Sequence, residues 1–119
     1  MIKMKMLKIP VQRRYKKPIT LFSNSVYSNY KDKIQKLIIF GSVARGEAKS
    51  DSDIDILVIW KGNKLDGWHS LESIAFNILL ETGVYISLKI VTPSEHKKMI
   101  LNNDHFIKTV SQEGIFIAS

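Results

Sequence analysis

Two short apolar segments, each joined to a small polar motif, constrain this chain more than any other feature. Residues 37–40 are apolar and lead into Gly41 and Ser42, and ten residues later a second apolar run begins with Asp53 and Asp55. Strand-forming residues dominate both runs, so each predicts a buried β-strand. Because residues i and i+2 of a strand point to the same face, we expect Asp53 and Asp55 to present their carboxylates together.

This pattern predicts a site for a metal ion and phosphate groups. Two neighbouring carboxylates repel each other by about 2 kcal/mol at an effective dielectric of about 20. A divalent cation bound to both would reverse that repulsion, and Mg²⁺ (or Mn²⁺) accepts carboxylate oxygens while keeping positions for water and phosphate. Gly41 allows close approach of the backbone to a ligand, Ser42 adds a hydroxyl and the start of a helix, and Arg45 is a candidate phosphate ligand.

The alternative is that these polar residues serve turns alone. Asp51, Ser52 and Asp53 are residue types that bond readily to nearby backbone, so they suit a loop without any ligand. Asp55 resists this interpretation because it lies inside the run Ile-Asp-Ile-Leu-Val-Ile. A carboxylate there costs free energy unless it is paired or binds a ligand, so Asp55 indicates a functional site.

The motif GS-x10-DxD resembles the signature of nucleotidyltransferases of the DNA polymerase β superfamily. The short chain further resembles the minimal nucleotidyltransferase (MNT) proteins of prokaryotes, which often pair with HEPN-domain proteins as toxin and antitoxin. The resemblance implies an α/β (α+β) fold like the polymerase β palm, with a small mixed sheet and helices packed on one face. It implies that Gly41 and Ser42 bind the phosphates of a nucleoside triphosphate, expected to be ATP, and that Asp53 and Asp55 bind the metal and act in catalysis.

One feature departs from the superfamily pattern, in which a later strand commonly supplies a third carboxylate. The candidate strand, residues 84–91, contains no acid, and its non-core face carries Ser87 and Lys89 where that carboxylate would be expected. Lys89 would either neutralise the aspartate pair or be a solvated surface charge. Two functions therefore stay open: transfer of a nucleoside monophosphate to a hydroxyl, for example on a HEPN partner, or a catalytically inactive antitoxin or binding subunit that acts by direct contact.

Length and charge narrow the remaining choices. A chain of 119 residues suits one domain, and the lack of cysteine excludes disulfides and thiolate chemistry and is compatible with a cytoplasmic location. The longest apolar run is far too short to span a membrane. The net charge of +7 lies in residues 1–18, which hold seven basic residues and no acid. We therefore divide the chain into a basic leader (1–18) and a single domain (19–119). The leader either binds nucleic acid or an acidic surface, or stays solvated. The sequence leaves homo-oligomerisation open.

Periodicity predicts the other elements. After a break at Pro18, apolar residues recur every fourth position and predict a helix with a buried stripe: Phe22, Val26, Tyr30 and Ile34. A second helix is expected from about Asp66 to Gly83, with a buried face made of Trp68, Leu71, Ile74, Ala75, Ile78 and Leu79. The segment Thr92-Pro93-Ser94-Glu95 predicts a helix start with a capping box, and a last helix is expected from Asp104 to Gly114.

Overall fold

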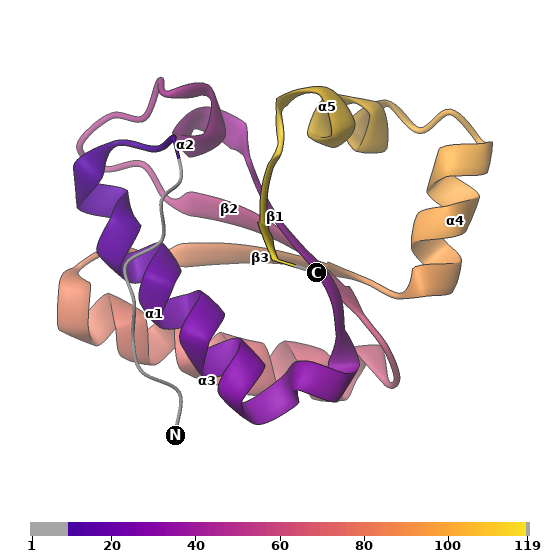
Figure 1. Ribbon diagram of the computed structural model, residues 1–119, viewed down its shortest axis with the longest axis horizontal. Coiled ribbons are helices and arrows are strands. Elements are labelled where there is room, and N and C mark those ends of the chain that lie inside the picture. The colour runs from indigo at the N-terminus through magenta and orange to yellow at the C-terminus, as the bar shows by residue number, and fades with distance from the viewer. Residues whose placement is uncertain (1–9, 119) are drawn as a thin grey trace.

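The computed structural model describes residues 10–118, which form a four-stranded sheet and five α-helices (Figure 1). In chain order the elements are α1 (Arg13–Tyr30), the 3-10 turn η1 (Lys31–Lys33), β1 (Ile34–Phe40), α2 (Gly41–Arg45), β2 (Ile54–Trp60), α3 (Lys64–Thr82), β3 (Ile86–Val91), α4 (Pro93–Leu101), α5 (His105–Glu113) and β4 (Ile115–Ala118). The strands and helices predicted around the Gly-Ser and Asp-x-Asp motifs are all present.

The sheet is mixed, with the strand order β3-β2-β1-β4. Strand β1 pairs antiparallel with β2 and β4, and β2 pairs parallel with β3. The parallel pair requires a crossover connection, which α3 supplies. The predicted α/β class with a small mixed sheet is therefore confirmed.

Helices pack on the sheet unequally. Helices α1 and α3 lie together below the sheet in Figure 1 and enclose the larger core, which includes Phe22, Leu37, Ile56 and Leu71. This is the helical layer that the sequence predicts. Helix α5 covers part of the second face through a smaller apolar cluster that includes Ile107 and Leu57. Phe40, which lies opposite Asp55, packs against this cluster, and Asp55 is half-buried at the same end of the face.

Helix α1 begins earlier than the sequence predicts. Pro18 does not break the chain but lies inside α1, where it is buried. A proline within a helix removes one backbone hydrogen bond, and burial of Tyr15 and Ile19 on the same helix offsets that cost. Residues 13–17 of the predicted leader are therefore helical, and its residues 1–9 lie outside the described part. The predicted stripe also ends sooner, because Ile34 belongs to β1.

The buried face of α3 differs from the prediction at one large residue. Leu71, Ala75 and Ile78 are buried as predicted, but Trp68 is 46% exposed. Gly67 takes the inward position instead, since a methyl group there would come within 2.7 Å of the Trp60 indole. The indole of Trp60 fills the space against the helix, so the neighbouring Trp68 is turned outward.

The predicted capping box of α4 is present and gives a measurable stability effect. The Thr92 hydroxyl accepts a hydrogen bond from the Glu95 amide at 3.1 Å, and the Glu95 carboxylate accepts one from the Thr92 amide at 3.0 Å. Thr92→Ala should lower the free energy of unfolding by about 1 kcal/mol. Chemical denaturation monitored by circular dichroism would measure this loss, and Thr92→Ser should retain most of the stability.

Candidate functional site

The polar motifs meet at one end of the sheet because β1 and β2 run in opposite directions. The register places Phe40, the last residue of β1, directly opposite Asp55 near the start of β2. Gly41 therefore turns the chain beside Asp55, with a φ of 76° that favours glycine. A methyl group on Gly41 would overlap the Asp55 carboxylate. The structure thus brings Gly41 and Asp55 into contact, although their roles stay predictions.

The two aspartates differ in environment. Asp53 precedes β2 and is exposed, whereas Asp55 is half-buried within the strand. Burial raises the pKa of the Asp55 carboxyl, the nearby Asp53 carboxylate raises it further, and the Arg45 guanidinium opposes the shift. A carboxylate held under these conditions would gain from a bound cation, because the cation offsets both the lost hydration and the repulsion.

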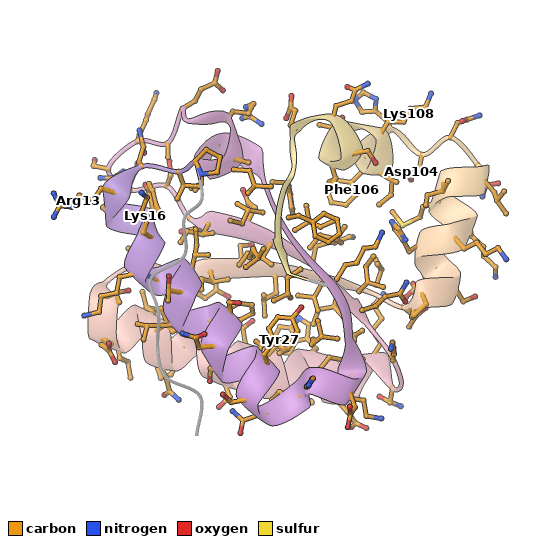
Figure 2. All side chains as sticks on the ribbon, viewed as in Figure 1. Arg13, Lys16, Tyr27, Asp104, Phe106 and Lys108 are labelled. Carbon is orange, nitrogen blue, oxygen red and sulfur yellow. The ribbon has the colours of Figure 1, made fainter. Side chains whose placement is uncertain are left out.

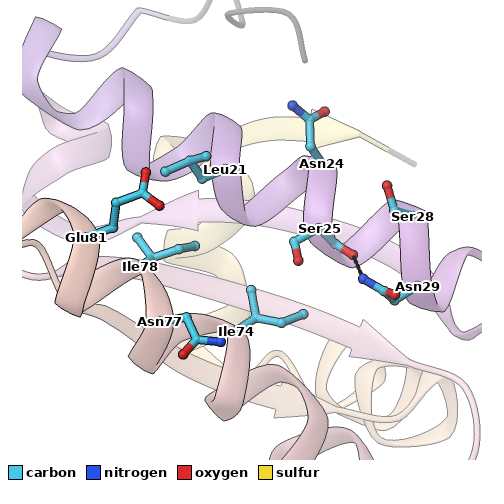
Figure 3. A pocket seen from close by; sticks show the side chains of 9 residues that line it. All are labelled: Leu21, Asn24, Ser25, Ser28, Asn29, Ile74, Asn77, Ile78 and Glu81. Carbon is cyan, nitrogen blue, oxygen red and sulfur yellow. Dashed lines mark hydrogen bonds between the residues drawn. The ribbon is translucent and has the colours of Figure 1, made fainter. Parts of the chain in front are cut away.

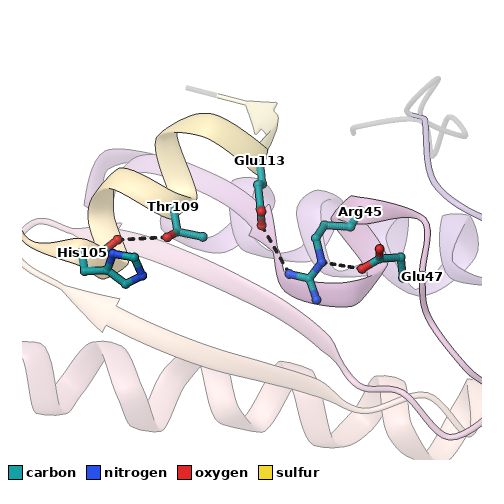
Figure 4. Close-up of polar contacts among 5 residues, drawn as sticks. All are labelled: Arg45, Glu47, His105, Thr109 and Glu113. Atoms are coloured by element: carbon teal, nitrogen blue, oxygen red, sulfur yellow. Dashed lines mark hydrogen bonds and ion pairs between the residues drawn. The ribbon is translucent and has the colours of Figure 1, made fainter.

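Arg45 lies at the end of α2 and is held by two acids (Figure 4). Its Nε donates to the Glu47 carboxylate at 2.7 Å, and one terminal nitrogen contacts the Glu113 carboxylate of α5 at 3.3 Å. Glu113 was not among the residues that the sequence singled out, and no local pattern connects it to Arg45. Phosphate binding by Arg45 stays a prediction, and a phosphate would compete with these two carboxylates for the guanidinium.

The strand expected to carry a third acid presents a hydroxyl next to Asp55. Ser87 of β3 is the register partner of Asp55, and Lys89 is the partner of Leu57 one repeat further along the same face. Within residues 10–118, no cluster of three or more His, Cys, Asp or Glu side chains is placed to hold a metal ion. Any metal at this site would therefore rely on Asp53 and Asp55 among the described residues.

The first turn of α1 supports the loop that precedes Asp53. The Tyr15 hydroxyl donates to the Lys49 carbonyl at 2.9 Å, and Arg14 contacts the same carbonyl. A pocket of about 200 Å³ opens beside this contact and is lined by Arg14, Tyr15, Asp53 and Tyr85, among others. Sequence reasoning missed Arg14 and Tyr15. One sequence signal could have indicated Tyr15: it continues the apolar stripe of the predicted helix on the N-terminal side of Pro18.

Comparison with known proteins identifies the family. A family model described as "Nucleotidyltransferase domain" matches residues 19–117. The chain belongs to this family.

Two relatives from Methanocaldococcus jannaschii resemble this nucleotidyltransferase domain over most of its length. One, named "Putative protein adenylyltransferase MJ0604", is 35% identical over 98 residues, which cover 82% of this chain and 92% of the relative. The second, "Putative protein adenylyltransferase MJ0141", is 32% identical over 95 residues, covering 79% and 89% of the two chains. A solved structure described as a "putative nucleotidyltransferase from Sulfolobus solfataricus" has the same fold, with a TM-score of 0.53 and 18% identity over 88% of this chain and 86% of that one.

The residues present fit a magnesium ion held by two carboxylates. Asp53 and Asp55 supply hard oxygen ligands near the Gly41 turn, where the missing side chain leaves the Asp55 carboxylate room against the backbone. Mg²⁺ commonly binds one or two carboxylates and completes its shell with water and substrate phosphates. The nucleotidyltransferase domain thus has the donors for such a site, with phosphate expected on the side of Gly41 and Ser42.

Tyr85 borders the same pocket as Asp53 but is not activated. Its hydroxyl donates to the Glu72 carboxylate at 2.6 Å, and this bond, with burial and the charges of Glu72 and Asp53, raises the pKa of Tyr85 to about 12. The phenol therefore stays neutral at physiological pH. It suits a wall of the pocket better than a nucleophile.

A larger groove lies between α1 and α3, which pack on the sheet face opposite Asp55 (Figure 3). It measures about 420 Å³ and combines polar residues such as Asn77 and Glu81 with Leu21, Ile74 and Ile78. The Asn29 side chain donates to the Ser25 carbonyl along one wall at 2.7 Å. The groove has neither aspartate among its lining residues, so its size does not connect it to the candidate site.

No helix within residues 10–118 has the length and apolar character to cross a membrane.

Proposed function

We propose that this protein transfers AMP from ATP to a hydroxyl group on a partner protein. The observation that carries the proposal is the contact between the Gly41 turn and the Asp55 carboxylate, in a chain that belongs to the nucleotidyltransferase family. The names of the two relatives, which describe protein adenylyltransferases, support a protein acceptor and an adenine nucleotide. The resemblance to MNT proteins supports a HEPN-domain protein as that acceptor.

The chain's residues would divide the reaction between binding and orientation. Asp53 and Asp55 would hold Mg²⁺, which when bound stabilises negative charge on the phosphate oxygens. The Gly41 and Ser42 turn would bind the outer phosphates and align the α-phosphorus with the acceptor. The acceptor oxygen then forms a bond to that phosphorus, the bond to the bridging oxygen breaks, pyrophosphate leaves and the hydroxyl proton passes to solvent. Positioning supplies much of the rate in such reactions.

A label-transfer assay tests the proposal. Purified protein, Mg²⁺ and ATP labelled at the α-phosphate are incubated with a co-expressed HEPN-domain protein, and label on that protein is measured after gel separation. We expect label with the wild type, a loss of at least about 100-fold with Asp53→Asn, and no label when the γ-phosphate carries it. Equal labelling by wild type and Asp53→Asn would contradict the proposal.

A second candidate function is a non-catalytic binding subunit that neutralises its partner by contact. Ser87 opposite Asp55 favours it, because a serine there leaves the metal site with two carboxylates among the described residues. In that case the variant Asp53→Asn combined with Asp55→Asn should still bind and inhibit the partner as the wild type does. Loss of inhibition together with loss of label would favour the transferase.

A further inference from the structure

We propose that Lys89 binds the phosphate groups of the nucleotide from the strand that lacks the third carboxylate. This inference rests on the proposed function and names a residue of the same site. Lys89 lies on β3, opposite Leu57 and one repeat beyond Ser87, so it occupies the same sheet face as Asp55. It is exposed, and its side chain has the length to reach along that face.

The Lys89 ammonium packs on an aromatic pair that extends to the residue opposite Asp55. Its Nζ lies over the Phe106 ring, 5.9 Å from the centroid. Phe106 extends from α5 toward the sheet in Figure 2 and packs edge-on against Phe40, with 5.1 Å between the ring centroids. Phe40 is the register partner of Asp55 and directly precedes Gly41. The Lys89 side chain and Phe40, which leads into the turn expected to bind phosphate, thus contact the same Phe106 ring on the sheet face that carries Asp55.

Lys89 is also an available cation. Among residues 10–118 its Nζ has no carboxylate within ion-pair distance, whereas Arg45 is bound by Glu47 and Glu113. A phosphate could therefore reach Lys89 without displacing an acid. Because Lys89 forms no ion pair within residues 10–118, it does not neutralise Asp53 or Asp55 by direct contact. Of Arg45 and Lys89, Lys89 is the one that can bind an anion without competition from an acid.

The charge of the site points to the same ligand. Two carboxylates, one divalent cation and one ammonium leave a net charge of about +1, whereas a carboxylate in place of the ammonium would make it about −1. An ammonium in place of a carboxylate weakens the attraction of the site for a metal ion alone and strengthens its attraction for a polyanion. A triphosphate carrying its own Mg²⁺ is the ligand that such a site would select.

The test separates metal binding from nucleotide binding. Binding of Mn²⁺ alone is followed by electron paramagnetic resonance, and binding of the Mg²⁺ complex of α,β-methylene-ATP by calorimetry, for wild type and Lys89→Gln. We expect Lys89→Gln to weaken nucleotide binding roughly tenfold and to strengthen Mn²⁺ binding about threefold, because a nearby positive charge is removed. Lys89→Arg should keep the nucleotide affinity within about threefold of wild type.

Lys36→Gln is the matched control. Its Nζ lies over the Phe116 ring at 5.5 Å, and its register partner is Ile59, toward the other end of β2 from Asp55. It should change neither affinity. A Lys89→Gln variant with unchanged nucleotide affinity overturns the inference, as does one in which the affinities for metal and nucleotide both rise, since Lys89 would then compete with the metal. Absence of nucleotide binding by the wild type would refute the proposed function and this inference together.

Discussion

Asp55→Asn should strongly weaken binding of the Mg²⁺ complex of ATP while making the free protein more stable. The half-buried carboxylate has a raised pKa, first from burial and then from repulsion by Asp53. The neutral amide removes both costs, so the free energy of unfolding at pH 7 and the Tm should both rise. Nucleotide affinity should fall at least about 100-fold, because the amide is a weak ligand for the metal. Differential scanning fluorimetry and calorimetry measure the two effects.

Asp32→Asn controls for the loss of one negative charge. Asp32 is exposed in η1, at the far end of β1 from Gly41. It should alter neither Tm nor nucleotide affinity by a measurable amount. If Asp55→Asn lowered Tm and left nucleotide binding intact, Asp55 would be a structural residue and the site would have to lie elsewhere.

From the sequence alone, the Gly-Ser turn and the two aspartates could be placed side by side, because these residues are close in the chain. Asp53 and Asp55 are two residues apart at the start of β2, and the short connection between β1 and β2 allows an antiparallel pair that returns Asp55 to Gly41. The register of β3 was not predictable in this way. It depends on how the 19-residue helix α3 packs, so sequence alone could not choose between Ser87 and Lys89 as the neighbour of Asp55.

Other features depended on packing between distant residues. Arg45 and Glu113 are separated by 68 positions, and their contact follows from the docking of α5 near α2. The start of α1 was misplaced because Pro18 is a strong local signal for a break, while burial of Tyr15 is a tertiary effect that outweighs it. Trp68 was assigned to the core by its place in the periodic apolar pattern of the helix, but the Trp60 indole packed on Gly67 fills that space.

Gly41→Ala should be the most damaging single methyl addition at the site. The residue has a φ of 76°, which costs a side-chain-bearing residue about 1 kcal/mol, and the new methyl would overlap the Asp55 carboxylate. Displacing that carboxylate disturbs a strand residue and a proposed metal ligand together. We expect a loss of roughly 2–4 kcal/mol in the free energy of unfolding and at least about a tenfold loss of nucleotide affinity.

Gly46→Ala separates the cost of backbone strain from the cost of the overlap with the Asp55 carboxylate. Gly46 has a φ of 72°, nearly that of Gly41, but a methyl group there would meet nothing within 4 Å. It should cost about 1 kcal/mol and leave nucleotide affinity unchanged. In an Asp55→Ala background, the stability cost of Gly41→Ala should fall to that of Gly46→Ala, because the overlapping carboxylate is gone. An equal cost of Gly41→Ala with and without the carboxylate would mean that the turn and Asp55 do not touch, and the proposed site would lose the contact on which it is built.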